Sequence, residues 1–168
     1  MIIKIDRSIP ITQQLARYGI GFAPHEGAPL PPDAGVKVVD EDKRSVAMEK
    51  INIDDIVFNL YLGIDRLCNQ RERIDYLKKR GKKFIRLDAG IAMALIQNAD
   101  RIPLDWGRDE NRTLVTAFTF DGTIFSESDG NKYVLQVLRD REDNEWTANF
   151  KHISDESENP TAVLPTGH

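Results

Sequence analysis

The spacing of apolar residues in the first part of the chain predicts short elements separated by loops. Ile3 and Ile5 alternate with polar residues and indicate a short N-terminal strand. Residues 12–18 predict one or two turns of helix that Gly19 ends, because glycine readily adopts the left-handed conformation that follows a helix. Residues 19–35 contain four glycines and four prolines, which excludes a regular element and predicts a long loop.

The next two patterns change from a two-residue period to a period of three or four residues. Residues 36–39 and 45–51 carry apolar side chains at alternating positions around a polar cluster, so an N-terminal β-hairpin is expected. Between residues 53 and 80, apolar residues recur every three or four positions, which predicts the longest helix of the chain. This spacing is broken once, at Arg71, so the segment fits either one helix or two.

The second half of the chain begins with a short apolar helix and then takes on a strand pattern. Asp88 is a favourable N-cap for a helix over residues 89–96, whose nearly continuous apolar sequence predicts burial. The period of two that follows predicts four strands, at residues 113–120, 123–127, 132–139 and 145–153. Asp121-Gly122 favours a type I′ turn between the first two strands. Residues 154–168, acidic and then proline-bearing, are expected to form a flexible tail.

Together these elements predict an α+β fold. A four-stranded antiparallel meander in the C-terminal half is expected to pack one face against two helices, with the N-terminal β-hairpin beside them. The apolar face of the meander would consist of Phe118, Phe120, Tyr133, Leu135, Val137, Trp146, Ala148 and Phe150. The length of 168 residues, of which 40% are hydrophobic, fits a single domain over residues 1–168.

Composition narrows the class of protein. No apolar run approaches the ~20 residues that a membrane-spanning helix needs, and the first residues do not resemble a signal peptide. Cys68 is the only cysteine, so the chain has no internal disulfide and no cysteine-based zinc site. These features predict a cytoplasmic protein without a membrane partner.

Charge is distributed unevenly along the chain, although the formal net charge is only -4. Residues 65–86 hold nine basic and three acidic side chains, a local net charge of +6. Residues 140–158 hold seven acidic and two basic side chains, a net charge of −5. Clustered cations attract phosphate groups and acidic proteins. The candidate binding residues are therefore Arg66, Arg71, Arg73, Lys78, Lys79, Arg80, Lys82 and Lys83.

The sequence contains no complete pattern for catalysis. Its three histidines lack the spacing of a zinc site, and neither a nucleophile elbow nor a phosphate-binding glycine loop occurs. Asp121, Glu127 and Asp129 resemble the carboxylates of a metal-dependent nuclease hairpin. Asp121 and Asp129 also stand at positions where turns favour aspartate for conformational reasons, which favours a structural role. We therefore predict no catalytic residue, no metal ligand and no cofactor.

Recognisable short sequences are scattered over most of the chain. They are Ile5–Pro10, Glu41–Ser45, Ile85–Ala89, Ile102–Trp106, Phe120–Thr123, Asp129–Val134, Trp146 and Pro160–Leu164. With these segments the chain resembles a family of small bacterial proteins whose activity is uncharacterised. The resemblance implies that the strands, the helices and the meander belong to one unit. It implies no activity, cofactor or partner.

Two functions fit these observations. The first is a non-enzymatic cytoplasmic protein-interaction module, of the adaptor or inhibitor type, whose acidic segment 140–158 docks on a basic partner protein. The alternative is a nucleic-acid-binding protein that uses the basic helix over residues 66–83. The carboxylates of Asp121, Glu127 and Asp129 would add metal-dependent cleavage to this alternative.

Overall fold

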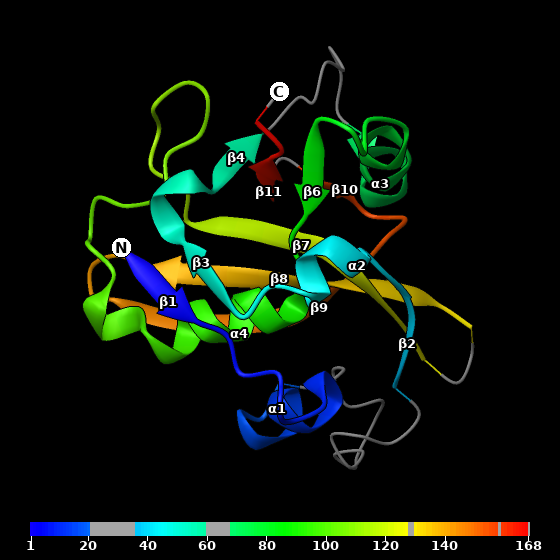
Figure 1. Ribbon diagram of the computed structural model, residues 1–168, viewed down its shortest axis with the longest axis horizontal. Coiled ribbons are helices and arrows are strands. Elements are labelled where there is room, and N and C mark those ends of the chain that lie inside the picture. Colours follow the sequence, from blue (N-terminus) through cyan, green and yellow to red (C-terminus); the bar gives the residue numbers. More distant parts are fainter. Residues whose placement is uncertain (21–35, 60–67, 128–129, 158, 168) are drawn as a thin grey trace.

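The computed structural model describes residues 1–20, 36–59, 68–127, 130–157 and 159–167 (Figure 1). The strands are β1 (Ile2–Lys4), β2 (Lys37–Glu41), β3 (Lys50–Asn52), β4 (Val57–Asn59), β5 (Cys68–Asn69), β6 (Phe84–Arg86), β7 (Ala117–Ser126), β8 (Lys132–Asp140), β9 (Glu145–His152), β10 (Glu156–Ser157) and β11 (Thr161–Pro165). The α-helices are α1 (Ile11–Arg17), α2 (Lys43–Val46), α3 (Gln70–Lys79) and α4 (Ala89–Gln97). Two 3-10 turns are η1 (Ile53–Asp55) and η2 (Ala99–Arg101).

The largest sheet is built around the long strand β7. β7, β8 and β9 pair antiparallel in sequence order, and β11 lies on the other side of β7 as a parallel neighbour, with Thr161 opposite Thr119. β2 pairs antiparallel with the C-terminal part of β7, and both β4 and β6 pair with β11. The α+β class is therefore confirmed, but the sheet is mixed and seven-stranded rather than a four-stranded meander.

Helices α3 and α4 lie on opposite faces of this sheet. Neighbouring residues of a strand point to opposite faces. In β8, Leu135 belongs to the apolar cluster that contains α4, whereas Val134 packs with Ile74 of α3. The expectation that both helices cover one face is therefore wrong. The sheet can bury both helices because it carries apolar side chains on both faces, and Val134 and Leu135 are each 0% exposed.

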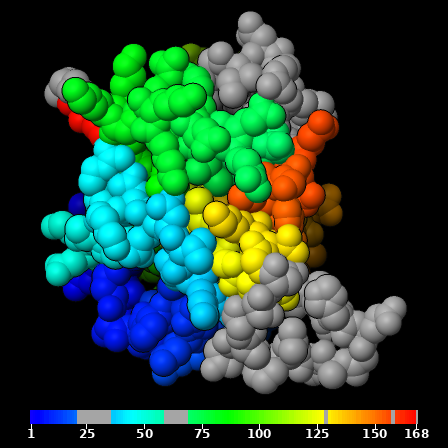
Figure 2. Space-filling model, turned by 90° about the vertical axis from the view of Figure 1, so that its right-hand side faces the viewer, coloured from blue at the N-terminus to red at the C-terminus, as the bar shows by residue number. Residues whose placement is uncertain are grey.

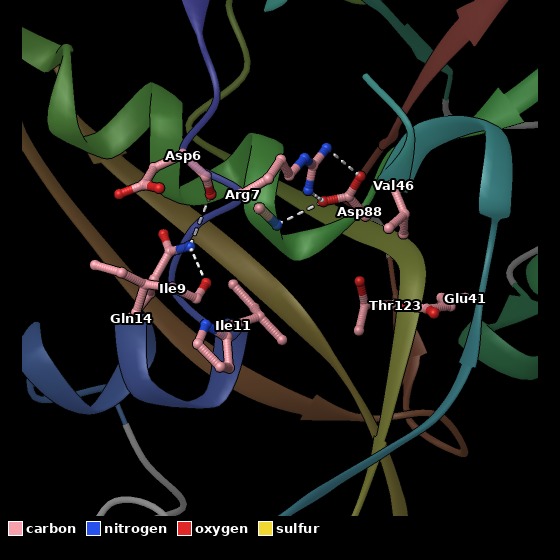
Figure 3. Close-up of a pocket in the computed structure, with 11 residues that line it drawn as sticks. Asp6, Arg7, Ile9, Ile11, Gln14, Glu41, Val46, Asp88 and Thr123 are labelled. Carbon is pink, nitrogen blue, oxygen red and sulfur yellow. Dashed lines mark hydrogen bonds and ion pairs between the residues drawn. The ribbon is translucent and has the colours of Figure 1, made fainter. Parts of the chain in front are cut away.

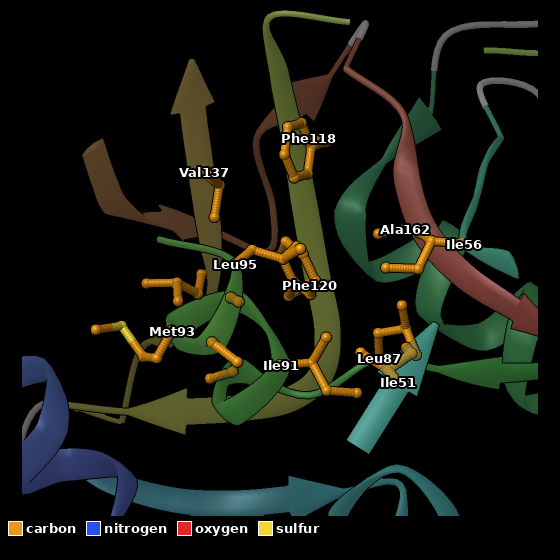
Figure 4. Packing of buried hydrophobic residues seen from close by; sticks show 14 of the residues in the cluster. Ile51, Ile56, Leu87, Ile91, Met93, Leu95, Phe118, Phe120, Val137 and Ala162 are labelled. Carbon is orange, nitrogen blue, oxygen red and sulfur yellow. The ribbon is translucent and has the colours of Figure 1, made fainter. Parts of the chain in front are cut away.

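The main core lies between α4 and the sheet, as Figure 4 shows. α4 contacts β7 and β8 on one side and α1 and β1 on the other, so its apolar residues are buried all round, as predicted. The residues of the predicted sheet face that are buried are Phe118, Phe120, Leu135, Val137 and Trp146. Those that are half-buried are Tyr133, Ala148 and Phe150. The core side of the meander was therefore assigned correctly.

Asp121-Gly122 lies inside β7 and forms no turn, so the hairpin predicted at this point is wrong. The N–H of Gly122 donates to Leu87 O, and its carbonyl accepts from the Asp42 N–H, both at 2.8 Å. A Cβ atom on residue 122 would lie 2.3 Å from Arg86 O. The glycine therefore permits a close approach between two backbone segments, where the register of β7 against β8 is irregular.

The helix predicted over residues 53–80 is wrong in its first part. Asn52 caps the start as expected, but only the 3-10 turn η1 follows, and the chain then enters β4. β4 forms because β11 pairs with it, a partner that the helical spacing cannot reveal. The helix α3 begins at Gln70, where Asn69 accepts a hydrogen bond from the Glu72 N–H at 2.9 Å.

The predictions of an N-terminal hairpin and of a flexible C-terminal tail are also wrong. β2 pairs with β7 and β3 pairs with β1, while α2 occupies the polar cluster where the hairpin turn was expected. Asp42 starts α2 by accepting a hydrogen bond from the Arg44 N–H at 3.2 Å. In the tail, β11 lies inside the sheet, and Thr161, Ala162 and Val163 are 0% exposed.

Two helix boundaries follow the sequence prediction. Gly19 has a φ of 67° and ends α1, and the Asp88 carboxylate caps α4 by accepting from the N–H groups of Gly90 and Ile91. None of the helices within the described ranges is long and apolar enough to cross a membrane. Of the predicted loop over residues 19–35, positions 21–35 lie outside the described residues.

Candidate functional site

A pocket of about 160 Å³ lies where the N-terminal segment meets the start of α4 and β7 (Figure 3). Its walls combine the polar Arg7, Asp88 and Thr123 with the apolar Ile9 and Ile11. In Figure 3 the Arg7 side chain points toward Asp88, whereas Thr123 faces the pocket from β7. Glu41 and Val46 also line the pocket, which is therefore built by segments from four distant parts of the sequence.

The Asp88 carboxylate in this pocket is fully occupied by structural contacts. Arg7 Nη1 and Nη2 donate to its two oxygens at 2.8 and 3.0 Å, and the Ser45 hydroxyl donates to Oδ2. The N–H groups of Gly90 and Ile91 donate to Oδ1. A carboxylate offers about four lone-pair positions, so these five hydrogen bonds leave none for a substrate proton or a metal. Asp88 joins the N-terminal segment, α2 and α4.

Asp121 is a second buried carboxyl, on the face of β7 that α3 covers. Its side chain is 0% exposed, and its Oδ2 accepts a hydrogen bond from Gln70 Nε2 at 3.0 Å. Burial raises the pKa of Asp121 to about 6, although the charge of Arg86 and the hydrogen bond from Gln70 oppose this. Its Oδ1 has no hydrogen-bond partner in the part of the chain that the structure describes.

The carboxylate cluster of the nuclease hypothesis is not assembled. Asp121 is fully buried, Glu127 follows the end of β7, and Asp129 lies outside the described residues. Six residues of strand separate Asp121 from Glu127, a distance on the order of 20 Å. Among the described residues, no group of three or more His, Cys, Asp or Glu side chains is placed to hold a metal ion. Asp121 and Glu127 therefore do not belong to one metal site.

The predicted basic residues lie on different sides of α3 and of the turn that follows it. Those that are exposed are Arg71, Lys78, Lys79, Arg80, Lys82 and Lys83. The Arg80 guanidinium lies over the Tyr76 ring, 4.4 Å from the ring centre. Arg73 is 3% exposed and donates a hydrogen bond to Asn159 O, so its prediction as a contact residue is wrong. Arg66 lies outside the described residues.

Two basic residues of α2, Lys43 and Arg44, lie beside this group, and they are outside the basic stretch of residues 65–86 that the charge count identified. The Arg44 side chain donates to the main-chain oxygens of Gly81 and Phe84, which fixes α2 against the turn after α3. The neighbouring Lys43 side chain is 80% exposed. Figure 2 shows the green atoms of α3 and its turn directly beside the cyan atoms of β2 and α2. We call Lys43, Arg44, Lys78, Lys79, Arg80, Lys82 and Lys83 the basic surface.

Acidic residues of β2 and its C-terminal end neutralise part of the basic surface. Asp40 lies 2.9 Å from Lys78 Nζ and 3.2 Å from Arg86 Nη2. Burial alone would raise the pKa of Asp40, but its contacts with these two cations lower the pKa below its ordinary value. Asp42 pairs with Arg44 at 2.7 Å. Lys43 pairs with Glu41 at 2.5 Å. Lys79, Lys82 and Lys83 form no such ion pair with another described residue, and they supply most of the uncompensated charge.

The acidic segment 140–158 does not form one surface. Four of its acids surround the turn between β8 and β9, namely Asp140, Glu142, Asp143 and Glu145. Asp155 and Glu156 follow the opposite end of β9, close to α3, where the Arg71 N–H donates to Ile153 O. The eight residues of β9 separate the two groups by roughly 25 Å. A partner of this segment would therefore meet two separate acidic clusters.

Comparison with known proteins assigns no function to this chain. No family model, no curated protein and no solved structure matches this chain. The resemblance to a family of small bacterial proteins therefore stays a prediction. The charges and contacts of the basic surface, with the buried carboxyls of Asp88 and Asp121, are the observations from which a function can be argued.

Proposed function

We propose that this protein is a non-enzymatic binding module that contacts the phosphate backbone of nucleic acid through the basic surface. The observation that carries the proposal is the group of exposed lysines at the end of α3 and in the turn after it, which a contact from α2 holds in place. Arg44 of α2 donates to Gly81 O, 37 positions further along the chain, in the turn that carries Lys82 and Lys83. Lys43 and Arg44 are themselves paired with Glu41 and Asp42, so the charge that can displace counterions from nucleic acid is that of the exposed Lys79, Lys82 and Lys83.

The local charge matters more to a phosphate at this surface than the net charge of -4. At physiological ionic strength the Debye length is about 8 Å, so exposed charges further away are largely screened. Lys79, Lys82 and Lys83 are exposed side chains. A lysine ammonium is a compact charge on a flexible stem and can follow a phosphate without a fixed geometry. These properties suit contact with a backbone rather than with particular bases.

The packing of α3 supports the same proposal. Ile74 is 3% exposed and Leu77 is 1% exposed, so the inner side of the helix is anchored in the core. Arg73 on this inner side donates to Asn159 O in the segment before β11. The lysines of the outer side therefore project from a helix whose position is fixed by apolar and polar contacts.

The two buried carboxyls support binding rather than hydrolysis as the proposed role. Asp88 accepts five hydrogen bonds from protein groups, and a general base needs a free lone pair. Asp121 is 0% exposed, so a substrate at the surface cannot reach it. Asp88 joins three segments of the fold, and Asp121 is enclosed between β7 and α3.

The test is a titration of short duplex DNA and single-stranded RNA at several salt concentrations. Wild-type binding should weaken with salt, with a log–log slope of about −0.9 for each phosphate contacted on duplex DNA. The variant Lys79→Gln/Lys82→Gln/Lys83→Gln should bind more weakly and lose about 3 from the magnitude of the slope. Fluorescence anisotropy measures both quantities.

The matched control is Lys4→Gln/Lys50→Gln/Lys132→Gln, which changes the net charge equally at three exposed lysines outside the basic surface. This control should retain the wild-type affinity and slope. Equal weakening in both triple variants would mean that only the overall charge matters. A wild-type protein that binds neither nucleic acid at low salt would refute the proposal.

A partner protein is the second candidate, and one observation favours it. Beside Lys43, a hollow of about 250 Å³ is lined by Val38 and Val39, which are 36% and 49% exposed. Exposed apolar side chains next to charge are typical of protein interfaces. Capture from a nuclease-treated lysate by wild-type protein and by Val39→Asp separates the candidates. A protein lost only with Val39→Asp supports this second function, and the loss of all captured material on nuclease treatment contradicts it.

A further inference from the structure

β9 is the last strand of the large sheet, and no other strand of the described residues pairs with its outer edge. The direction of its main-chain groups follows from one hydrogen bond, which the Ile153 N–H donates to Lys132 O at 3.1 Å. Bonded positions alternate along an antiparallel pair, so Thr147 also points its main-chain groups toward β8. Trp146 and Ala148 therefore direct their N–H and C=O groups away from the sheet.

We propose that β9 pairs antiparallel with β9 of a second copy of this chain, with the two-fold axis at Ala148. In such a pair each residue lies opposite the residue equally far on the other side of the axis. Glu145 therefore lies opposite Lys151 of the second copy, and the reverse contact repeats at the other end. The edge is complementary to itself in charge.

The charge pattern selects this position of the axis over its neighbours. An axis at Thr147 would place Glu145 opposite Asn149, and no ion pair forms. An axis at Asn149 would place Lys151 opposite Thr147, with the same loss. Only the axis at Ala148 joins both charged ends of the strand, and opposite charges directly across a strand pair stabilise it.

The side chains of β9 are compatible with a close approach at this axis. Glu145, Thr147 and Asn149 are exposed on the outer face of the sheet, and Lys151 lies half-buried on the same face near Asp155. On the other face, Ala148 is half-buried beside the main core. A small side chain at the two-fold axis lets the two strands meet without a clash, and the second copy covers it.

The dimer is expected to be weak and dependent on concentration. One pair of eight-residue strands buries less than the ~800 Å² per partner of a standard interface. Its energy comes mainly from main-chain hydrogen bonds along an edge that would otherwise be open. Dissociation in the micromolar range is therefore the expected behaviour of the full chain.

Sedimentation velocity of the full chain over roughly 1–500 μM tests the proposal, with urea unfolding as a check on each variant. Glu145→Lys should weaken the dimer about ten-fold or more, because it replaces two attractions by two repulsions. Glu145→Lys/Lys151→Glu should restore the affinity. Ala148→Pro should give a monomer with a native fold, because the N–H that proline lacks points away from β8.

Three results would overturn the pairing. The first is a wild-type protein that stays monomeric at the highest concentration. The second is a dimer that forms equally well with folded Glu145→Lys and Ala148→Pro, which would place the interface elsewhere. The third is a charge swap that folds normally and stays as weak as Glu145→Lys. The matched control Lys132→Glu, on β8, should leave the wild-type equilibrium unchanged.

Discussion

Replacing Asp121 by asparagine should make the protein more stable at neutral pH. Asp121 is 0% exposed in β7, beneath the start of α3. Asparagine has nearly the same shape, never ionises, and keeps an oxygen that can accept the hydrogen bond from Gln70 Nε2. The substitution therefore removes the charge of the buried group and little else.

The magnitude follows from the pKa of this carboxyl. Burial raises the pKa of Asp121 from 3.8 to about 6, and each pH unit between the folded and unfolded values is worth about 1.4 kcal/mol. Well below pH 4 the group is protonated in both states, and its contribution to stability is fully present. As the pH rises through 6, the unfolded chain releases the proton more readily, so about 3 kcal/mol of stability is lost.

The assay is urea unfolding of wild-type protein and Asp121→Asn between pH 4 and pH 8, followed by fluorescence of Trp106 and Trp146. The difference between the two free energies of unfolding isolates Asp121 from the other ionisable groups. Relative to pH 4, where the unfolded carboxyl is already about half ionised, the variant should gain about 2.5 kcal/mol over the wild type at pH 7.5. Asp143→Asn, at an exposed position, is the control for a simple change of net charge and should show no such gain.

A difference that stays constant over the whole pH range would refute this reasoning, because it would mean that Asp121 does not change its charge differently in the two states. A difference in the free energy of unfolding that changes with pH in the opposite direction would also refute it. If the wild type gained on the variant as the pH rose, the carboxylate would be the favoured form, held by Arg86 and Arg73.

Three further substitutions test the fold by urea unfolding. Phe118→Ala should cost about 3–5 kcal/mol, because the ring is 1% exposed, and a loss below about 1 kcal/mol would place it on the wrong face. Gly122→Ala should destabilise by several kcal/mol, because its Cβ would lie 2.3 Å from Arg86 O, and wild-type stability would contradict that approach. Asp88→Ala should cost about 3–5 kcal/mol, because Arg7 loses its anion and α4 its cap; a loss under about 1 kcal/mol would show that neither contact matters.

Elements with a local cause could be predicted from the sequence. Gly19 ends α1 and Asp88 caps α4 because a cap depends on residues within one turn of it. The two-residue period of β8 likewise identified the face that packs against α4, since Leu135 and Val137 both belong to the main apolar cluster. In these cases the neighbours along the chain decide the conformation.

Elements with a distant cause could not be predicted. The strand Thr161–Pro165 follows an acidic stretch, and Pro160 and Pro165 stand at its two ends, which disfavours a strand. It nevertheless pairs with three strands, β4, β6 and β7. The dipeptide Asp121-Gly122 is the strongest local sequence signal for a turn. In the structure, however, the missing side chain of Gly122 lets the backbones of Leu87 and Asp42 approach β7. A glycine suits both a tight turn and a close approach of another backbone segment, and only the tertiary contact shows which of the two occurs.

The sequence predicts which residues of the candidate site are charged, but not which of them point to the surface. A count of charges identified the lysines at the end of α3, but it also included Arg73, which is buried. The helical period could have shown that Arg73 is buried, because it shares one side of the helix with the apolar residues. The buried residues of α3 are Gln70, Arg73, Ile74 and Leu77. Lys43 and Arg44 could not be found this way, since they reach the surface through a tertiary contact.

The contacts beneath the basic surface explain why it suits an extended anion better than a shaped ligand. Gln70 binds Asp121 at the start of α3, and Arg44 binds the turn after it. The Thr166 N–H also donates to Lys83 O at 2.9 Å, so the backbone of this turn is held from two sides. Binding then has to order only lysine side chains, each with up to about 2 kcal/mol of rotamer entropy. Flexible charges on a fixed backbone can follow many phosphate geometries, which favours contact without sequence preference.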